Sequence, residues 1–217
     1  MVRQSFMAAA VAAGLAFAGT AHAVSFDISG GSYSLGSDYG CSGTGNTTTL
    51  FCATFSTTIG NPAPFSLNSV GDSQTLNFGS IVFNEDGNNI VAGETDNISV
   101  TAILNFTDPF AGNVQSIAVV GAFTGVINDS DVDYSLTFSA VTQNFGNGGQ
   151  FEVDFGDLSW TGNSTTPKTH TVKITLLSAP QEQQQVQELI QAIPEPGTLA
   201  LAGSALIGLA FARRRRR

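Results

Sequence analysis

The chain has 217 residues, with 17 acidic residues against 8 lysines and arginines, a formal net charge of −9 and a pI near 4.4. Five of the basic residues form the C-terminal run 213–217. Residues 24–195 hold all 17 acidic residues but only two lysines, which gives that segment a net charge of −15. Such an acidic surface repels nucleic acid and anionic lipid headgroups, so we exclude nucleic acid as a partner.

Residues 1–23 have the three parts of a secretory signal peptide. Arg3 supplies a positive charge, residues 6–19 form an apolar core, and Ala21-His22-Ala23 is a small-residue cleavage site. We expect signal peptidase to remove this segment during export through the inner membrane. The mature protein would then begin at Val24.

Residues 24–180 predict a single all-β domain. Apolar and polar residues alternate with the period of a strand that buries one face, or form short continuous apolar runs. These segments are residues 50–59, 76–83, 98–106, 117–127, 134–140, 151–155 and 172–176. Clusters of Gly, Asn, Asp and Pro between them supply turns. We expect about eight to ten strands in an antiparallel β-sandwich of jelly-roll or immunoglobulin-like type, with phenylalanines in its interior.

Cys41 and Cys52 are the two cysteines of the chain. Export would place them in a compartment where disulfides persist. A bridge that closes this loop of roughly 12 residues would stabilise the fold by about 3 kcal/mol in the chain-entropy model. We therefore predict a disulfide between them.

Three carboxylates in five residues make Asp129, Asp131 and Asp133 a candidate cation site. A hard cation such as Ca²⁺ would relieve their repulsion through oxygen coordination. The segment does not match an EF-hand, because Tyr134 occupies the glycine position and Ala140 the position of the bidentate glutamate. A solvated acidic turn and a weak Ca²⁺ site both stay open, and we expect no other cofactor.

Few residues point to catalysis. His170 is the one histidine beyond the signal peptide, and we expect it at the solvent-facing edge of a strand. No Gly-x-Ser-x-Gly elbow accompanies it. Glu152 and Asp154 share one strand face, as an acidic wet face or as the paired acids of a glycosidase. Trp160, the single tryptophan, is either an exposed platform for a sugar or a buried anchor. We predict that the protein is not an enzyme.

The C-terminal region has four consecutive parts. Residues 181–193 are rich in Gln and Glu and predict a linker or a short amphipathic helix. Pro194, Glu195 and Pro196 form a rigid polar turn, and residues 197–212 form an apolar run of about 24 Å as a helix, slightly short of a bilayer span. Arginines 213–217 would hold the end of the chain on the cytoplasmic side.

The order of the Pro194-Glu195-Pro196 triplet, the apolar segment and the arginine run closely resembles the PEP-CTERM sorting signal of Gram-negative, biofilm-forming bacteria. The resemblance covers about the last 25 residues. It implies recognition by an exosortase, a membrane protease-transpeptidase, with cleavage near the triplet and export to the cell surface or extracellular polymeric matrix. Residues 197–212 would then lie in the inner membrane only transiently. An anchor that is never cleaved is the alternative.

These features together predict an exported surface or matrix protein with a structural or adhesive role in a biofilm or exopolysaccharide. The alternative is an extracellular carbohydrate-binding or hydrolase domain on a jelly-roll fold.

Overall fold

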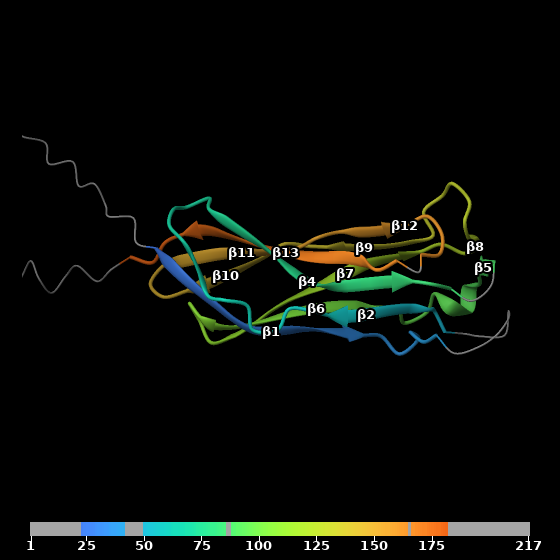
Figure 1. The fold of residues 1–217 in the computed structure, drawn as a ribbon, viewed down its shortest axis with the longest axis horizontal. Coiled ribbons are helices and arrows are strands. Elements are labelled where there is room, and N and C mark those ends of the chain that lie inside the picture. The colour runs from blue at the N-terminus through green and yellow to red at the C-terminus, as the bar shows by residue number, and fades with distance from the viewer. Residues whose placement is uncertain (1–22, 42–49, 86–87, 165, 182–217) are drawn as a thin grey trace, which may run out of the picture. The chain divides into compact units, whose positions relative to one another are not determined.

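The computed structural model describes residues 23–41, 50–85, 88–164 and 166–181, which form antiparallel sheets almost throughout (Figure 1). The described residues up to Ala179 belong to one compact unit, and a second unit begins at Pro180. The all-β prediction is confirmed. The predicted signal peptide, apart from Ala23, and the predicted C-terminal helix lie outside the described residues.

One antiparallel sheet has six strands in the order β12-β9-β7-β6-β1-β3. Its strands are β1 (Val24–Leu35), β3 (Phe65–Leu67), β6 (Val100–Asp108), β7 (Gly112–Ala122), β9 (Tyr134–Phe138) and β12 (Leu158–Trp160). The strand β6 is flanked by β1 and β7 along most of its length, with Ala102 opposite both Tyr33 and Ser116.

A second antiparallel sheet has five strands in the order β10-β11-β13-β4-β2. Its strands are β2 (Ala53–Thr57), β4 (Ser73–Phe83), β10 (Val141–Phe145), β11 (Gly149–Phe155) and β13 (Lys168–Ser178). Two short strands, β5 (Asn89–Ile90) and β8 (Gly125–Val126), pair separately, and one 3-10 turn, η1, spans Ala92–Glu94. The strand β13 lies inside its sheet, between β11 and β4.

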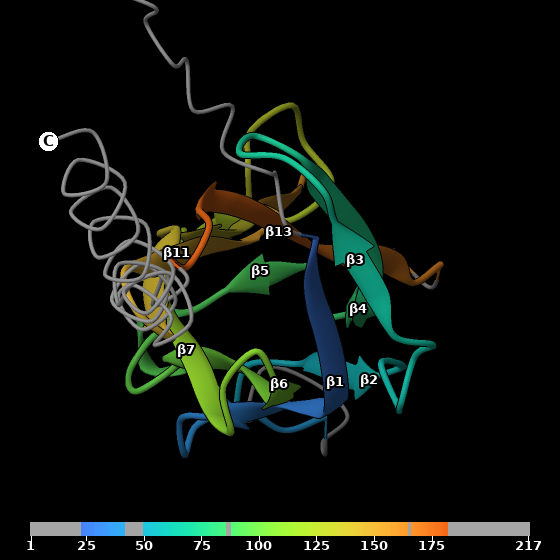
Figure 2. The same cartoon turned by 90° about the vertical axis from the view of Figure 1, so that its left-hand side faces the viewer.

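The two larger sheets pack face to face around a common aromatic core. Seen end-on, β11 and β13 lie opposite β1 and β6 (Figure 2). The ring of Phe151 on β11 lies 5.2 Å from those of Phe26 on β1 and Phe106 on β6, each distance joining ring centroids. Such aromatic pairs add about 0.5–1.5 kcal/mol to the free energy of burial. The prediction of a phenylalanine-rich interior holds for most rings, although Phe123 is exposed.

Two glycines allow close approach where β1 crosses the second sheet. A Cβ atom on Gly31 would lie 2.6 Å from the ring of Phe78 and 2.9 Å from Ile59. On Gly79 it would lie 2.4 Å from the carbonyl oxygen of Ser56. A larger residue at either position would push strands apart, so these glycines bring Tyr33 on β1 into the core beside β4 and β13.

The structure corrects the predicted strands in two ways. The longest strand, β1, was not predicted, because its alternation of Val24, Phe26 and Ile28 is interrupted by register shifts before Gly30. The predicted segment 117–127 is the end of β7 followed by a separate short strand, β8. The other four alternating segments do fall on strands, because their alternation is uninterrupted: residues 98–106 overlap β6, residues 134–140 contain β9, and residues 151–155 and 172–176 lie within β11 and β13.

Candidate functional site

The predicted disulfide is present. Cys41 and Cys52 are bonded, with their Cα atoms 4.5 Å apart. Beside the bridge, Tyr39 and Phe51 form an isolated parallel pair, in which the amide of Phe51 donates to the carbonyl of Asp38 at 2.9 Å. The bridge therefore joins the chain just after β1 to the start of β2. The intervening residues 42–49 lie outside the described residues.

Glu85 supports the same end of the domain. Its buried carboxylate accepts the amide hydrogen of Cys52 at 2.7 Å. Its backbone exchanges two hydrogen bonds of 2.8 Å with the side chain of Asn163. Glu85 thus links the disulfide to the loop that follows β12.

The acidic turn does not gather its three carboxylates. Asp129 and Asp131 are exposed, and the amide of Asp131 donates to the Asp129 carboxylate at 2.8 Å. Asp133 is buried, and its amide donates to the carbonyl of Trp160 at 2.9 Å. Burial raises the pKa of Asp133, and the nearby charges of Asp129 and Asp131 raise it further. Among the described residues no group of three or more His, Cys, Asp or Glu side chains could hold a metal ion.

Trp160 is a core residue and not a surface platform, which corrects one of the two readings of the sequence. Its side chain is 1% exposed and stacks on Tyr134, with ring centroids 5.2 Å apart. The ammonium of Lys168 covers the ring at 5.1 Å from its centroid and donates to the carbonyl of Ser159. A sugar therefore has no access to the Trp160 ring from solvent.

Tyr134, which is buried, and Tyr39, which is half-buried, extend this cluster. The Tyr39 hydroxyl donates to the carbonyl of Ile98 at 2.7 Å and lies 2.8 Å from the Tyr134 hydroxyl, from which it accepts a hydrogen bond. Burial raises the pKa of both hydroxyls. Both tyrosines stay protonated at neutral pH and act as structural donors.

His170 is fully buried, and not at a solvent edge as predicted, because β13 is an interior strand of its sheet. The centroid of its ring lies 5.0 Å from that of Phe138 and 5.6 Å from that of Phe78. Tyr33 and Phe155 complete this aromatic cage, with centroids at 5.8 and 6.2 Å. In the sheet register His170 lies opposite Gly79.

The cage keeps His170 neutral. Burial lowers the pKa of His170 to about 4, against weaker opposing effects of the Gly156 backbone and the Asp157 charge. The Tyr33 hydroxyl lies 2.6 Å from Nδ1. A protonated tyrosine hydroxyl can donate or accept, so the direction of this hydrogen bond follows the tautomer of the imidazole. This hydrogen bond links β1 to β13.

Glu152 and Asp154 lie on the outer face of β11. Asp154 is opposite Lys173 on β13, and the two charged groups are 4.0 Å apart. Partly exposed ion pairs of this kind contribute little to stability. The two acids form a wet strand face with a neighbouring cation.

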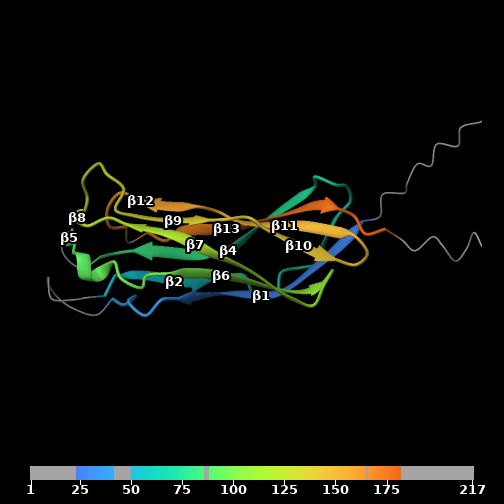
Figure 3. The same ribbon diagram turned by 180° about the vertical axis from the view of Figure 1, so that it is seen from behind.

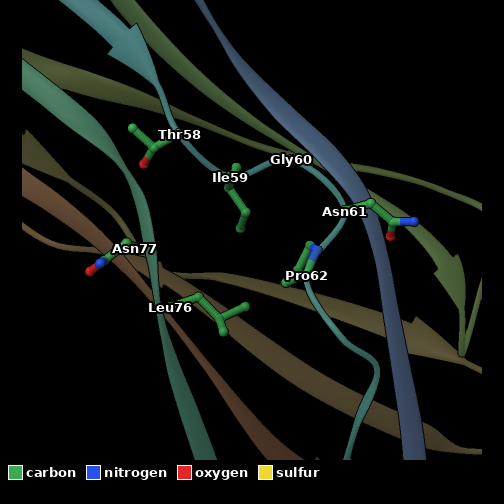
Figure 4. A pocket seen from close by; sticks show the side chains of 7 residues that line it. All are labelled: Thr58, Ile59, Gly60, Asn61, Pro62, Leu76 and Asn77. Carbon is green, nitrogen blue, oxygen red and sulfur yellow. The ribbon is translucent and has the colours of Figure 1, made fainter.

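A pocket of about 380 Å³ lies between the β2–β3 loop and β4 (Figure 4). Ile59, Pro62 and Leu76 project toward its centre, whereas the amides of Asn61 and Asn77 point away from one another. Ligand sites need polar groups that converge on the bound molecule. This pocket was not predicted, and the side-chain amides that line it do not converge.

The functional feature that can be assigned lies at the C-terminus. The family model for the PEP-CTERM protein-sorting motif matches residues 192–217. This chain carries a PEP-CTERM sorting motif. The match contains Pro194, Glu195, Pro196, the apolar run and the arginines. The PEP-CTERM motif implies processing by an exosortase and export to the cell surface or extracellular space.

The comparisons give no relative for the β domain. Neither a curated protein nor a solved structure matches the chain. Among the described residues, no helix is long and apolar enough to cross a membrane, and the predicted segment 197–212 lies outside them. The PEP-CTERM motif therefore indicates that this protein is exported. It does not indicate the role of the β domain.

Proposed function

We propose that this protein is a non-enzymatic structural or adhesive component of the cell surface or extracellular matrix. The PEP-CTERM motif at residues 192–217 is the observation that carries the proposal, since it directs a protein outside the cell. The Cys41–Cys52 disulfide suits the same compartment.

The placement of the chemically versatile side chains supports a structural role. His170 and Trp160 are both in the core, each packed against tyrosine and phenylalanine rings. A histidine in that position stabilises the fold and contacts no substrate. The acids Glu152 and Asp154 face solvent beside Lys173, with no aromatic ring on their strand face to bind a sugar.

We take the two face-to-face sheets as a β-sandwich that withstands the extracellular environment through its core and its disulfide. The jelly-roll and immunoglobulin-like subclasses stay open as proposals. A carbohydrate-binding or hydrolase domain is the alternative role, and the pocket beside Pro62 is a structural candidate for its site.

The sorting step is tested by the intact mass of the mature protein, measured separately in the membrane, surface and medium fractions of its native host. We expect a species that begins at Val24, ends near Pro194–Pro196 and is found outside the cell. A variant with Pro194, Glu195 and Pro196 all replaced by alanine should stay in the cell envelope with Arg217 attached. A wild-type chain that keeps Arg217 in the membrane fraction would make the C-terminus an ordinary anchor.

The adhesive role is tested in a strain that lacks the gene. We expect less matrix-bound biomass, restored by the wild-type gene and not by the triple-alanine variant. Full biomass in the deletion strain would contradict this role. Hydrolysis of a matrix polysaccharide by the purified protein would favour the alternative.

Weak Ca²⁺ binding by the exposed Asp129 and Asp131 would let the acidic surface cross-link matrix polymers. Calcium titration of the purified protein tests this, with Asp129→Asn and Asp131→Asn as the paired variant. No heat and no shift in melting temperature with the wild type would remove cation bridging from the proposal.

A further inference from the structure

The first strand of the domain begins at the residue that follows the expected cleavage site of the signal peptide. Ala23 is exposed and precedes the strand, whereas Val24 is the first residue of β1 and is only 6% exposed. The bond to be cut joins these two residues, so its nitrogen is the backbone nitrogen of Val24. The expected cut therefore lies at the boundary between exposed chain and folded sheet.

The residues directly after this bond are held by an adjacent strand and by the core. Residues 24–26 of β1 pair antiparallel with residues 65–67 of β3. Phe26 is fully buried, and its ring stacks on that of Phe65, with ring centroids 5.3 Å apart. It also meets the ring of Phe151 on β11 at 5.2 Å between centroids. Both backbone pairing and side-chain packing thus fix the start of β1.

The expected exosortase site has a different relation to the sheets. The start of β1, in blue, and the end of β13, in orange, lie at the same end of the domain (Figure 3). Both ends of the described chain therefore leave the domain there. The N-terminal cut directly adjoins a paired strand, whereas the triplet Pro194–Pro196 lies well beyond Ser178, the last residue of β13, in the sequence.

We propose that signal peptidase must cut this chain before β1 pairs with β3, so that removal of the signal peptide precedes completion of the fold. A peptidase holds the residues on both sides of the bond in its own cleft. Residues that are buried and paired in a strand reach such a cleft only when the strand opens locally. When opening is fast relative to cleavage, the cleavage rate follows the small population of the open form.

The two expected cuts therefore differ in their relation to folding. In a folded precursor, Val24 would have to leave β3 and the core before the signal peptide could be removed. A cut near Pro194–Pro196 breaks no pairing between described strands, so it can follow folding. The inference rests on the expected cleavage before Val24 and is independent of the adhesive role.

The test uses the full-length precursor, unfolded in urea and diluted into detergent micelles under oxidising conditions. Purified signal peptidase is added either at once or after the precursor has folded, and intact mass identifies the bond that is cut. We expect cleavage before Val24 in both samples, with an initial rate at least tenfold lower for the folded precursor. The Cys41–Cys52 disulfide and a cooperative melting transition verify that the second sample is folded.

The matched control is a precursor with Gly-Ser-Gly-Ser inserted between Ala23 and Val24. It keeps the small-residue cleavage site but separates the bond to be cut from the first residue of β1. We expect its folded and unfolded samples to be cut at similar rates. Cleavage of the folded control also verifies that the peptidase in the micelle reaches the N-terminal end of a folded chain.

Equal cleavage rates for the folded and unfolded wild-type samples would overturn the inference. So would a folded insertion variant that is cut as slowly as the folded wild type, because burial of Val24 would then not be the cause. Cleavage at another bond would remove the expected mature N-terminus and the inference with it. None of these results bears on the adhesive role, which the deletion strain tests separately.

Discussion

The same strands of the six-stranded sheet bury the side chains of one face and expose those of the other. Along β6, Val100, Ala102 and Leu104 point inward and are fully buried, whereas Thr101 and Ile103 point outward. On β7 the contrast is stronger, because buried Val114 and Ala118 alternate with Gln115, Ile117 and Val119. Side chains on the inner face therefore determine the free energy of unfolding, whereas those on the outer face can be substituted with little effect on the fold.

The largest effect is expected from the inner face. Phe151→Ala removes a fully buried ring that contacts Phe26, Phe106 and Phe145, and we expect a loss of about 3–5 kcal/mol of unfolding free energy. Denaturant unfolding of the mature protein measures it. A loss below about 1 kcal/mol would mean that the shared aromatic core is not as tightly packed as described.

The disulfide should come next. Replacing Cys41 and Cys52 together by serine releases the loop between β1 and β2, and we expect a loss of about 3 kcal/mol. Reduction of the wild type should cause the same loss and should have no effect on the double variant. If reduction leaves the unfolding free energy unchanged, the bridge does not restrain the unfolded chain.

Acid should lower the unfolding free energy of the protein through protonation of His170. The unfolded chain binds a proton at its ordinary pKa near 6.5, but the buried imidazole has a pKa of about 4. Between these values unfolding takes up a proton, so stability is full above about pH 6.5 and falls as the pH decreases toward 4, by of order 3 kcal/mol.

His170→Gln provides the control for this pH dependence, since it removes the titration but keeps a polar side chain near the Tyr33 hydroxyl. We expect the variant to be less stable at pH 7 and to show a shallower decrease in stability between pH 7 and 5. Equal slopes for the two proteins would show that His170 is not the group that titrates. An imidazole NMR titration can assign the pKa, because no other histidine follows the signal peptide.

The smallest effect on stability is expected from the outer face. Val119→Lys places a charge at a position that is 71% exposed, and the unfolding free energy of the monomer should change by no more than about 0.5 kcal/mol. Thermal unfolding at low concentration measures it. A loss comparable to that of Phe151→Ala would show that the outer face is packed against another part of the chain.

The strands that could be predicted are those whose periodicity is local and uninterrupted. Residues 151–155 alternate without a break and form the centre of β11. In β1 the bulge around Ile28 and the glycines that follow hide the pattern, because the apolar residues change register within one strand. The short strand β12 carries too few residues to show a period.

The candidate sites also divide into those that a contiguous sequence pattern reveals and those that form only when distant strands pack together. The sorting motif could be predicted because its parts are consecutive, and the disulfide because the chain has two cysteines in an exported segment. The inward turn of Asp133 and the aromatic surroundings of His170 could not, since both depend on strands far apart in the sequence.

By itself, the sequence determined the all-β class, the acidic character, the disulfide and the route of export. Each of these follows from composition, from local alternation or from a contiguous motif. Only the tertiary structure decided that Trp160 and His170 are buried, and that Ile117, Val119 and Ile103 share an uncharged surface. Burial and surface patches are created by the pairing and packing of distant strands. Local periodicity can indicate which side chains share a strand face but not what that face meets.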